Sequence, residues 1–268
     1  MSDQRNQDSW NRLSPYYQAT KAISLEDVHY SPYGPGEKEL RIIGDVSGLD
    51  ILELGCGGGQ NAIVLAKWGA KSVTGLDQSE KQLEHAKTLA KSQGVTVKFV
   101  KGSMENLSLF KDSSFDLILS SHAMNYVENL SQVFIESARV LRKNGRIVTC
   151  MGHPIMHLLW EALETKSLNK IGNYFSEERK VWEWPDDKNE PIATFEDTGY
   201  RFEEIINYLI QSGFKIERVV EPSGYSVEKI KNMKLDAIPY RDAGKIDYEF
   251  VEIQQKIPFS FIVSAKKE

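Results

Sequence analysis

The sequence lacks several features that would place it in a specialised class of protein. It has only two cysteines among 268 residues, Cys56 and Cys150, which are too few for a disulfide framework and do not match the spacing of zinc ligands. No stretch approaches the ~20 apolar residues that span a bilayer, and the opening MSDQRNQDSW is too polar for a signal peptide. We therefore expect a cytoplasmic protein with reduced thiols, no metal site and no membrane contact.

Positive charge is also scarce. The chain has 33 Lys and Arg residues against 38 Asp and Glu residues, so its formal net charge of −5 repels a phosphate backbone. This balance, with no basic tract, disfavours nucleic acid as a partner. Internal repeats and long Pro, Gly or Ser tracts are absent as well, which excludes a repeat architecture and a flexible linker. The length is that of one large domain or one domain with an insertion.

Between residues 50 and 151, short apolar runs alternate with longer amphipathic ones. DILELG, SVTGLD, VTVKFV, FDLILSS and NGRIVTC have the composition of strands, whereas NAIVLAKWG, SEKQLEHAKTLAKSQG and LSQVFIESARVL have helical periodicity. Ser79 is suited to cap the second of these helices and Gly94 to end it. The alternation predicts an α/β fold in which helices cover both faces of a parallel sheet.

The flanking regions follow different patterns. Helices are expected over about 8–23 and 36–45, and the strand–helix rhythm fails after Cys150 until it returns with RFEEIINYLIQSG as a helix, FKIERVVEP as a strand, a polar loop through residue 245 and FSFIVSAKK as a last strand. We expect a short helix after Pro154 within the irregular part. The predicted segments are an N-terminal helical lid (1–49), a core (50–151), a cap insertion (152–199) and the C-terminal part of the sheet (200–268).

The segment ILELGCGGGQNA carries the strongest functional signal. Glu53 ends a strand and three glycines, Gly55, Gly57 and Gly59, precede a helix, so the backbone can turn sharply and approach a ligand closely. A tight turn without a ligand would explain the glycines alone. The position three after Gly57 is Gln60, which departs from the dinucleotide fingerprint and disfavours a nicotinamide-dependent oxidoreductase.

Asp77 ends the next predicted strand, 24 residues after Glu53. A carboxylate there can accept hydrogen bonds from both hydroxyls of a ribose, which indicates a nucleoside ligand. Together ELGCGGG, GLDQS, VKGSMENLSLFKDSSFDLILSSHAMNYV and ARVLRKNGRIV resemble the class I S-adenosylmethionine-dependent methyltransferases, over residues 50 to 150. The resemblance implies a Rossmann-like, doubly wound, seven-stranded sheet, mostly parallel with an antiparallel last strand, and S-adenosyl-L-methionine as the cofactor.

The resemblance also implies roles for individual residues. The glycine loop would lie against the methionine part of the cofactor, Asp77 would hold the ribose, Gln78 would flank the adenine, and Ser103 and Met104 would read the adenine edge. The family often has Asp where Ser103 stands. Cys56 is as well explained by its small size as by a role, and Met104 by core packing. The expected cofactor-binding residues are Tyr17, Glu53, Gly55, Cys56, Gly57, Gly59, Asp77, Gln78, Ser103, Met104, Glu105 and Ser120.

Two of the five histidines are placed for catalysis. His122 follows the fourth predicted strand and His153 the fifth, and ligands of open α/β sheets bind beyond the carboxyl ends of strands. Either imidazole could take a proton from the methyl acceptor, or could simply hydrogen-bond substrate or backbone. His85 lies on an amphipathic helix and is expected at the surface. Methyl transfer needs a base only if the acceptor must lose a proton, and most of the acceleration can come from positioning.

The acceptor pocket is expected from the N-terminal segment and the insertion, where aromatic residues cluster. Trp182 and Trp184 share one face if VWEWP is extended, because side chains alternate along a strand. For each aromatic residue, a place in the small core of the cap is the alternative. The expected substrate-binding residues are Tyr30, Tyr33, His122, His153, Tyr174, Trp182, Trp184 and Tyr200.

These observations predict an enzyme that transfers a methyl group from S-adenosylmethionine to a small-molecule acceptor. The alternatives are a methyltransferase that acts on nucleic acid or protein and a non-catalytic S-adenosylmethionine-binding protein. The first is disfavoured because the fourth strand runs into SSHAMNYV and not into an Asn/Asp-Pro-Pro-aromatic motif. Turnover of any acceptor would exclude the second. The acceptor, the atom methylated and the oligomeric state are not encoded in any pattern that we can identify.

Overall fold

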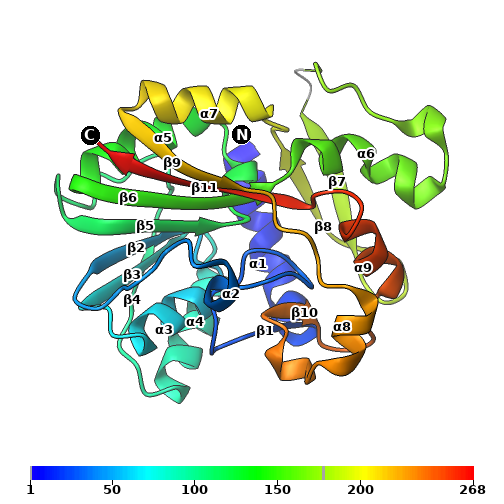
Figure 1. Cartoon of the computed structure of the whole chain (residues 1–268), viewed down its shortest axis with the longest axis horizontal. Coiled ribbons are helices and arrows are strands. Elements are labelled where there is room, and N and C mark those ends of the chain that lie inside the picture. The colour runs from blue at the N-terminus through cyan, green and yellow to red at the C-terminus, as the bar shows by residue number, and fades with distance from the viewer. Residues whose placement is uncertain (1, 177–178) are drawn as a thin grey trace.

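A seven-stranded sheet forms the centre of the computed structural model, which describes residues 2–176 and 179–268 (Figure 1). The strands are β1 (Lys21–Ile23), β2 (Asp50–Leu54), β3 (Ser72–Asp77), β4 (Lys98–Lys101), β5 (Phe115–Ser121), β6 (Leu141–Gly152), β7 (Lys180–Pro185), β8 (Pro191–Asp197), β9 (Phe214–Val220), β10 (Tyr240–Asp242) and β11 (Ser260–Lys267). The α-helices are α1 (Ser2–Thr20), α2 (Glu37–Leu40), α3 (Gln60–Lys67), α4 (Glu80–Ser92), α5 (Leu130–Val140), α6 (Pro154–Thr165), α7 (Phe202–Gln211), α8 (Val227–Asn232) and α9 (Tyr248–Gln254). Three 3₁₀ turns span Met124–Tyr126, Leu168–Lys170 and Leu235–Ala237.

The strand order of the central sheet is β4-β3-β2-β5-β6-β11-β9. Neighbours from β4 to β6 pair in parallel, and β11 runs antiparallel to both β6 and β9. This confirms the predicted doubly wound sheet with an antiparallel last strand. The pairing places the carboxyl ends of β2, β3, β5 and β6 along one edge, where ligands of such folds bind.

Helices cover both faces of the sheet, with α5 and α7 on one face and α3 and α4 on the other (Figure 1). The central strands are buried on both faces because of this cover, and β2 and β5 therefore consist largely of Leu and Ile. Ser79 caps α4, since its hydroxyl accepts a hydrogen bond from the backbone N–H of Gln82, as predicted. Gly94 follows the helix with a positive φ of 66°.

The predicted helix over 36–45 is wrong beyond its first turn. Helix α2 ends at Leu40, and Arg41 adopts the left-handed conformation with a φ of 51°. The buried carboxylate of Glu37 then accepts hydrogen bonds from the backbone N–H groups of Ile42 and Ile43. A side chain thus takes the place of the next turn of backbone bonds, which helical periodicity does not indicate.

The prediction of a plain polar loop through residue 245 is also wrong. The segment between β9 and β11 contains α8, β10 and α9, and it has a small core of its own formed by Tyr33, Tyr225, Ile230, Ile238 and Val251. Strand β10 pairs with β1, in a register that aligns Lys21 with Asp242. The elements are too short for a clear local pattern, because β10 has three residues and its partner lies near the other end of the sequence.

The region after β6 forms helix α6 and an antiparallel hairpin of β7 and β8. Helix α6 begins after Pro154, as expected. Side chains alternate along β7, so Trp182 and Trp184 share the less exposed face. Within the described ranges, no helix combines the length and the apolar composition needed to cross a membrane.

Candidate functional site

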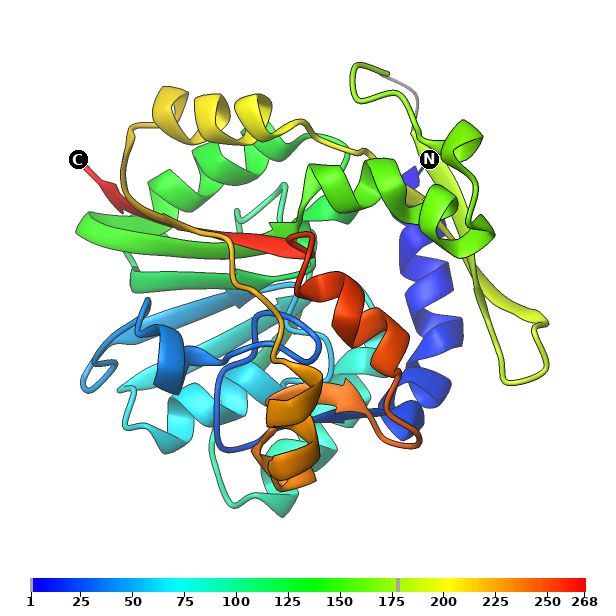
Figure 2. The ribbon, with the colours of Figure 1, turned by 45° about the vertical axis from the view of Figure 1, so that its right-hand side comes forward.

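A large cavity lies at the edge where β2, β3, β5 and β6 end, and helices α1, α6 and α9 stand around it (Figure 2). Its volume is 1280 Å³. A pocket for one small ligand typically measures ~300–1,000 Å³. The cavity therefore has room for two ligands side by side. We call the end at β2 and β3 the cofactor end and the end lined by α6, α9 and β7 the acceptor end.

The glycine loop forms the floor of the cofactor end. Gly55, Gly57 and Gly59 all have positive φ, at 68°, 50° and 80°. A Cβ on Gly55 would lie 2.1 Å from the Cβ of Ala123, whereas a Cβ on Gly57 would meet no atom within 4 Å. Gly55 is thus required by packing between β2 and the end of β5, and Gly57 leaves open space on the ligand side. Cys56 is buried beneath Gly75 with a raised thiol pKa, which favours its interpretation as a small packing residue.

The carboxylate of Asp77 organises the loop beside it. Its Oδ2 accepts a hydrogen bond from the backbone N–H of Gly57, and its Oδ1 accepts one from the backbone N–H of Ser79, both at 2.8 Å. Burial raises the pKa of Asp77. The backbone N–H of Gln78 also bonds to this carboxylate, which keeps capacity to accept from a ligand hydroxyl.

Glu53 lines the same end of the cavity and has a buried, unsatisfied oxygen. The side chain is 3% exposed, and its Oε2 has no hydrogen-bond partner among the described residues. Burial raises the pKa of Glu53 to about 8. A buried acceptor without a partner is costly, so a ligand that brings a donor or a positive charge would be favoured there.

Only some of the residues expected near the adenine line the cavity. Met104 lines it, as does Gln78, whose backbone carbonyl accepts from Gln7 of α1. The hydroxyl of Ser103 instead accepts from the backbone N–H of Glu105, and the Glu105 carboxylate accepts from the backbone N–H groups of residues 128 and 129. Ser120 is fully buried and donates to the carbonyl of Leu54. Ser103, Glu105 and Ser120 are therefore used inside the fold and do not line the cavity.

Helix α1 covers the cofactor end with amide side chains, which the sequence analysis did not identify. Gln18 donates to Gln82 at 2.8 Å and accepts from Gln60 at 2.7 Å, and its side chain lies directly over Gly58. Asn6 binds the backbone carbonyls of Tyr126 and Glu196. These bonds connect α1 to the glycine loop at one end and to the hairpin at the other. Residue spacing gave no signal for them, because Asn and Gln on a helix are normally solvent-exposed.

His122 lines the acceptor end directly after β5. Its φ is 53°, a conformation that non-glycine residues rarely adopt, and its Nε2 lies 2.6 Å from the carbonyl oxygen of Tyr30. A carbonyl can only accept, so Nε2 carries the hydrogen and Nδ1 holds the lone pair. Burial lowers the pKa of His122 to about 4, which keeps the ring neutral near pH 7.

His153 is used differently. Its Nδ1 accepts from the backbone N–H of Ile155 and thereby caps α6, while its Nε2 lies 2.9 Å from Glu221. His153 lines the cavity, and both of its ring nitrogens are engaged in the fold, so its expected catalytic role stays a prediction. Two other histidines, His29 and His157, line the cavity and were missed. Burial lowers the pKa of His29 to about 3 and that of His157 to about 4.

The predicted aromatic residues divide into two groups. Tyr17, Tyr33, Trp182 and Trp184 line the cavity, and the ring of Tyr17 packs against that of Trp184 at 5.6 Å between centroids. The other expected residues do not line it, because their hydroxyl groups are used in the fold. These are Tyr30, which donates to Glu37, Tyr174, which accepts from Phe202, and Tyr200, which donates to the carbonyl of Glu128.

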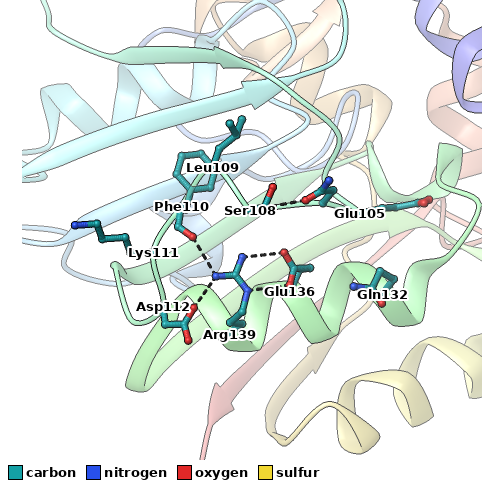
Figure 3. A pocket seen from close by; sticks show the side chains of 10 residues that line it. Glu105, Ser108, Leu109, Phe110, Lys111, Asp112, Gln132, Glu136 and Arg139 are labelled. Carbon is teal, nitrogen blue, oxygen red and sulfur yellow. Dashed lines mark hydrogen bonds and ion pairs between the residues drawn. The ribbon is translucent and has the colours of Figure 1, made fainter.

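A second hollow of 880 Å³ lies between residues 105–112 and α5 (Figure 3). The guanidinium of Arg139 crosses it and binds Glu136, Asp112 and the carbonyls of Phe110 and Leu107. Each N–H group of this guanidinium thus donates to a neighbouring residue, so Arg139 connects α5 to the preceding loop.

Comparisons with known proteins identify the family. A family model described as a methyltransferase domain matches residues 52–149. The chain is 43% identical over 126 residues to the uncharacterized methyltransferase YbaJ of Bacillus subtilis, which covers 47% of this chain and 49% of that protein. It is 30% identical over 192 residues to a demethylmenaquinone methyltransferase of Lactococcus lactis, over 69% of this chain and 74% of the relative.

The fold has solved counterparts as well. An S-adenosylmethionine-dependent methyltransferase from Mesorhizobium loti superimposes with a TM-score of 0.60 at 23% identity, over 86% of this chain and 96% of that one. The chain spans about half the length of YbaJ, and the family model matches the part of the chain that carries the glycine loop. The segments around the acceptor end contribute less to the similarity than the glycine loop and the strands that follow it.

Proposed function

Because the chain belongs to the S-adenosylmethionine-dependent methyltransferase family, we propose that it transfers a methyl group from S-adenosylmethionine to a small-molecule acceptor. The observation that carries this proposal is the single cavity of 1280 Å³, which joins a nucleoside-type site to an aromatic acceptor end with a neutral imidazole. The N-terminal segment 1–49 and the insertion 152–199 act as the lid and cap of that cavity.

The residues of the cofactor end fit S-adenosylmethionine. Asp77 would hold the ribose with its remaining acceptor capacity, the open space over Gly57 would admit the methionine part, and the carboxyl group of Glu53, which lines this end, would lie beside its ammonium group. Gln78 and Met104 would flank the adenine. The cofactor, when bound, supplies an electrophilic methyl group on a positively charged sulfur.

The protein's own contribution is positioning, exclusion of water and proton removal. Helix α1 and the hairpin β7–β8 cover the cavity, so both ligands are held in a fixed relation, which can supply most of the rate acceleration. His122 accepts a proton from the acceptor at Nδ1, because Nε2 is fixed as a donor by the Tyr30 carbonyl. The pKa of about 4 makes it a weak base that is fully available at neutral pH.

A small-molecule acceptor is supported by the relatives. Their names include demethylmenaquinone methyltransferase and ubiquinone biosynthesis O-methyltransferase, both of which denote small acceptors. The net charge of −5 also argues against nucleic acid. The aromatic lining of the acceptor end, with Trp182 and Trp184 on β7, is suited to a planar molecule.

Calorimetry and a methyl-transfer assay test this proposal together. We expect S-adenosylmethionine and S-adenosylhomocysteine to bind and NADH not to bind. With an accepted substrate, His122→Asn should lower kcat roughly 10²-fold while leaving S-adenosylhomocysteine affinity unchanged, since Asn tolerates the positive φ and removes the Nδ1 base. Failure of both nucleosides to bind would refute the proposal, and binding without turnover of any acceptor would favour a non-catalytic binding protein.

A further inference from the structure

Four polar side chains from distant parts of the chain meet at the acceptor end: Tyr17 of α1, His29 before α2, His122 after β5 and Tyr240 of β10. The hydroxyl oxygens of Tyr17 and Tyr240 lie 2.8 Å apart. The ring of His29 contacts that of Tyr240 at 5.3 Å between centroids, and His29 lies close enough to His122 for their charges to interact. The four side chains therefore form one continuous polar strip along an otherwise aromatic wall.

The strip retains hydrogen-bonding capacity that the fold does not use. In a pair of hydroxyls only one hydrogen lies between the two oxygens, so the Tyr17–Tyr240 pair keeps one O–H that can donate to a ligand. His122 keeps the lone pair of Nδ1. The Nδ1 of His29 is buried and has no partner among the described residues. A spare donor on the tyrosine pair and a spare acceptor on His122 thus lie along the same wall, beside the unpartnered Nδ1 of His29.

The charged side chains of the acceptor end either bond to other groups of the protein or are exposed to solvent. Lys21 forms an ion pair with Asp242, which also accepts from Tyr33. Lys180 donates to the carbonyl of His157 at 2.6 Å, and the guanidinium of Arg241 donates to backbone carbonyls of its own segment. Asp197 accepts from the backbone N–H of Gly199. The remaining carboxylates at this end belong to exposed residues on the rim: Glu161, Glu164, Glu183 and Asp247.

The rest of the lining is aromatic. Trp184 packs against Tyr17 from β7, and Phe250 packs against Trp160 at 6.2 Å and Phe259 at 5.2 Å between centroids. Flat walls of this kind favour a planar ligand that can pack against them. A charged ligand, by contrast, would lose hydration, and the less exposed charged side chains at this end, such as Lys21 and Lys180, already bond to groups of the protein.

We propose that the acceptor is an uncharged, hydroxylated ring compound of the phenol or hydroquinone class, whose one hydroxyl faces His122 while a second ring oxygen accepts from the Tyr17–Tyr240 pair. This inference rests on the proposed function and names the acceptor class of the same cavity. In the step assigned to the protein, the O–H bond of the acceptor breaks, its proton bonds to Nδ1 of His122, and the electron pair stays on the acceptor oxygen or is shared with the ring. The imidazolium later returns the proton to solvent.

Matched naphthalene probes test the proposal by calorimetry, with S-adenosylhomocysteine bound. They are 2,7-dihydroxynaphthalene, 2-naphthol, 2-naphthoate and 2-naphthylmethylammonium. We expect the diol to bind at least tenfold more tightly than either charged probe. It should also exceed 2-naphthol by about two- to tenfold, which is the range of one neutral hydrogen bond.

Variants locate the contacts. The double variant Tyr17→Phe/Tyr240→Phe keeps both rings and should reduce the diol-to-naphthol ratio to about one. His122→Asn should weaken both hydroxylated probes by a similar factor. Tyr16→Phe and His85→Asn are the controls, since Tyr16 donates to Asp187 and neither residue lines the cavity. Both should match the wild-type protein.

Several results would overturn the inference. If a charged probe bound to the wild-type protein as tightly as the diol, that result alone would overturn the inference, whatever the variants showed. A diol preference that survives the double tyrosine variant would also contradict it. S-adenosylhomocysteine binding separates the two levels: if it is absent, the proposed function fails, and if it is present without a preference for hydroxylated probes, only the acceptor class is wrong.

Discussion

The two ends of the cavity are built in contrasting ways. The floor of the cofactor end comes from one stretch, residues 53 to 104, and its shape depends on backbone conformation, as the three positive φ values of the glycine loop show. The acceptor end combines α1, the loop around His29, the hairpin β7–β8 and the segment with β10 and α9. Its surface depends on side chains, such as the Tyr17–Tyr240 pair, that meet across the whole sequence.

This difference distinguishes the part of the site that the family model matches from the part that can differ between relatives. Backbone geometry around Gly55 and Asp77 is suited to one ligand, and a family model matches that part of the chain. Side chains on separate segments can be exchanged without altering the sheet, so the acceptor end is free to differ between relatives. Substitutions at the two ends should therefore have separable effects.

The largest effect is expected at Gly55. Gly55→Ala places a Cβ 2.1 Å from Ala123 at a φ of 68°, so we expect a loss of about 3 kcal/mol or more in the free energy of unfolding, together with loss of S-adenosylhomocysteine binding. Gly57→Ala is the matched control. Its new Cβ would meet no atom, so only the ~1–2 kcal/mol of left-handed strain should appear in denaturant unfolding. Equal losses for both variants would contradict the packing argument.

Asp77 should give the next largest effect, confined to the cofactor end. Asp77→Ala removes the acceptors of two backbone N–H groups and of the expected ribose hydroxyls, each charge-assisted bond being worth ~1.5–3 kcal/mol before water compensates. We expect S-adenosylhomocysteine affinity to fall about tenfold or more in calorimetry. Unchanged affinity would remove Asp77 from the cofactor site.

Trp184 should give the opposite pattern. Trp184→Ala should raise the acceptor KM by about five- to a hundredfold, because the ring contributes ~1–3 kcal/mol, while the Kd of S-adenosylhomocysteine stays within about threefold. Trp182 is a poorer test because it packs on buried Phe195 at 4.9 Å and supports the hairpin itself. Tyr200→Phe is the control, since Tyr200 bonds to the backbone near α5 and should leave KM unchanged. A loss of cofactor affinity in Trp184→Ala would show that the two ends are not separable.

A further effect concerns pH, where the contributions of the two ends to stability should change with opposite sign. His122 has a folded pKa of about 4, below its ordinary value near 6.5, so the unfolded chain binds more protons between these values and stability falls as the pH drops from about 6.5 to 4. Glu53 has a folded pKa of about 8, so the folded chain binds more protons between about 4.5 and 8, and stability falls as the pH rises through that range.

Thermal melts at a series of pH values measure both contributions. His122→Asn should flatten the acid limb of the Tm profile, and Glu53→Gln should flatten the limb above about pH 5, by changes on the order of 2–4 °C for each kcal/mol. If Glu53→Gln left the upper limb unchanged, the carboxyl would not be protonated in the folded protein.

The sequence predicted the sheet and the cofactor end because their signals are local. Each of the residues Gly55, Gly57 and Asp77 lies within a few residues of the strand that positions it. Apolar runs between amphipathic helices are typical of a parallel sheet. The family resemblance predicted which sequence positions lie near the cofactor, but it did not predict where their side chains point. Ser120 shows this limit, because its hydroxyl turns inward to the Leu54 carbonyl.

The acceptor end was predicted less well because its contacts are not local. Trp182 and Trp184 were found through strand alternation, which is a local pattern. Tyr240 was missed because its hydroxyl partner, Tyr17, lies 223 residues away and β10 is too short to be identified. The role of His153 stays a prediction, because a capping hydrogen bond to Ile155 cannot be distinguished from a catalytic position by place in the sequence alone.

The pairing of β1 with β10 has a consequence for how the molecule assembles. Lys21 and Asp242, which face each other in that pair, are separated by 221 residues, so nearly the whole chain must be ordered before these strands can meet. Contacts of such long sequence separation form late, because the entropy of closing the loop is lost before they stabilise anything. A newly made chain should therefore gain its nucleoside site while the acceptor wall is still open, and β10 and α9 complete the wall to which α1 contributes.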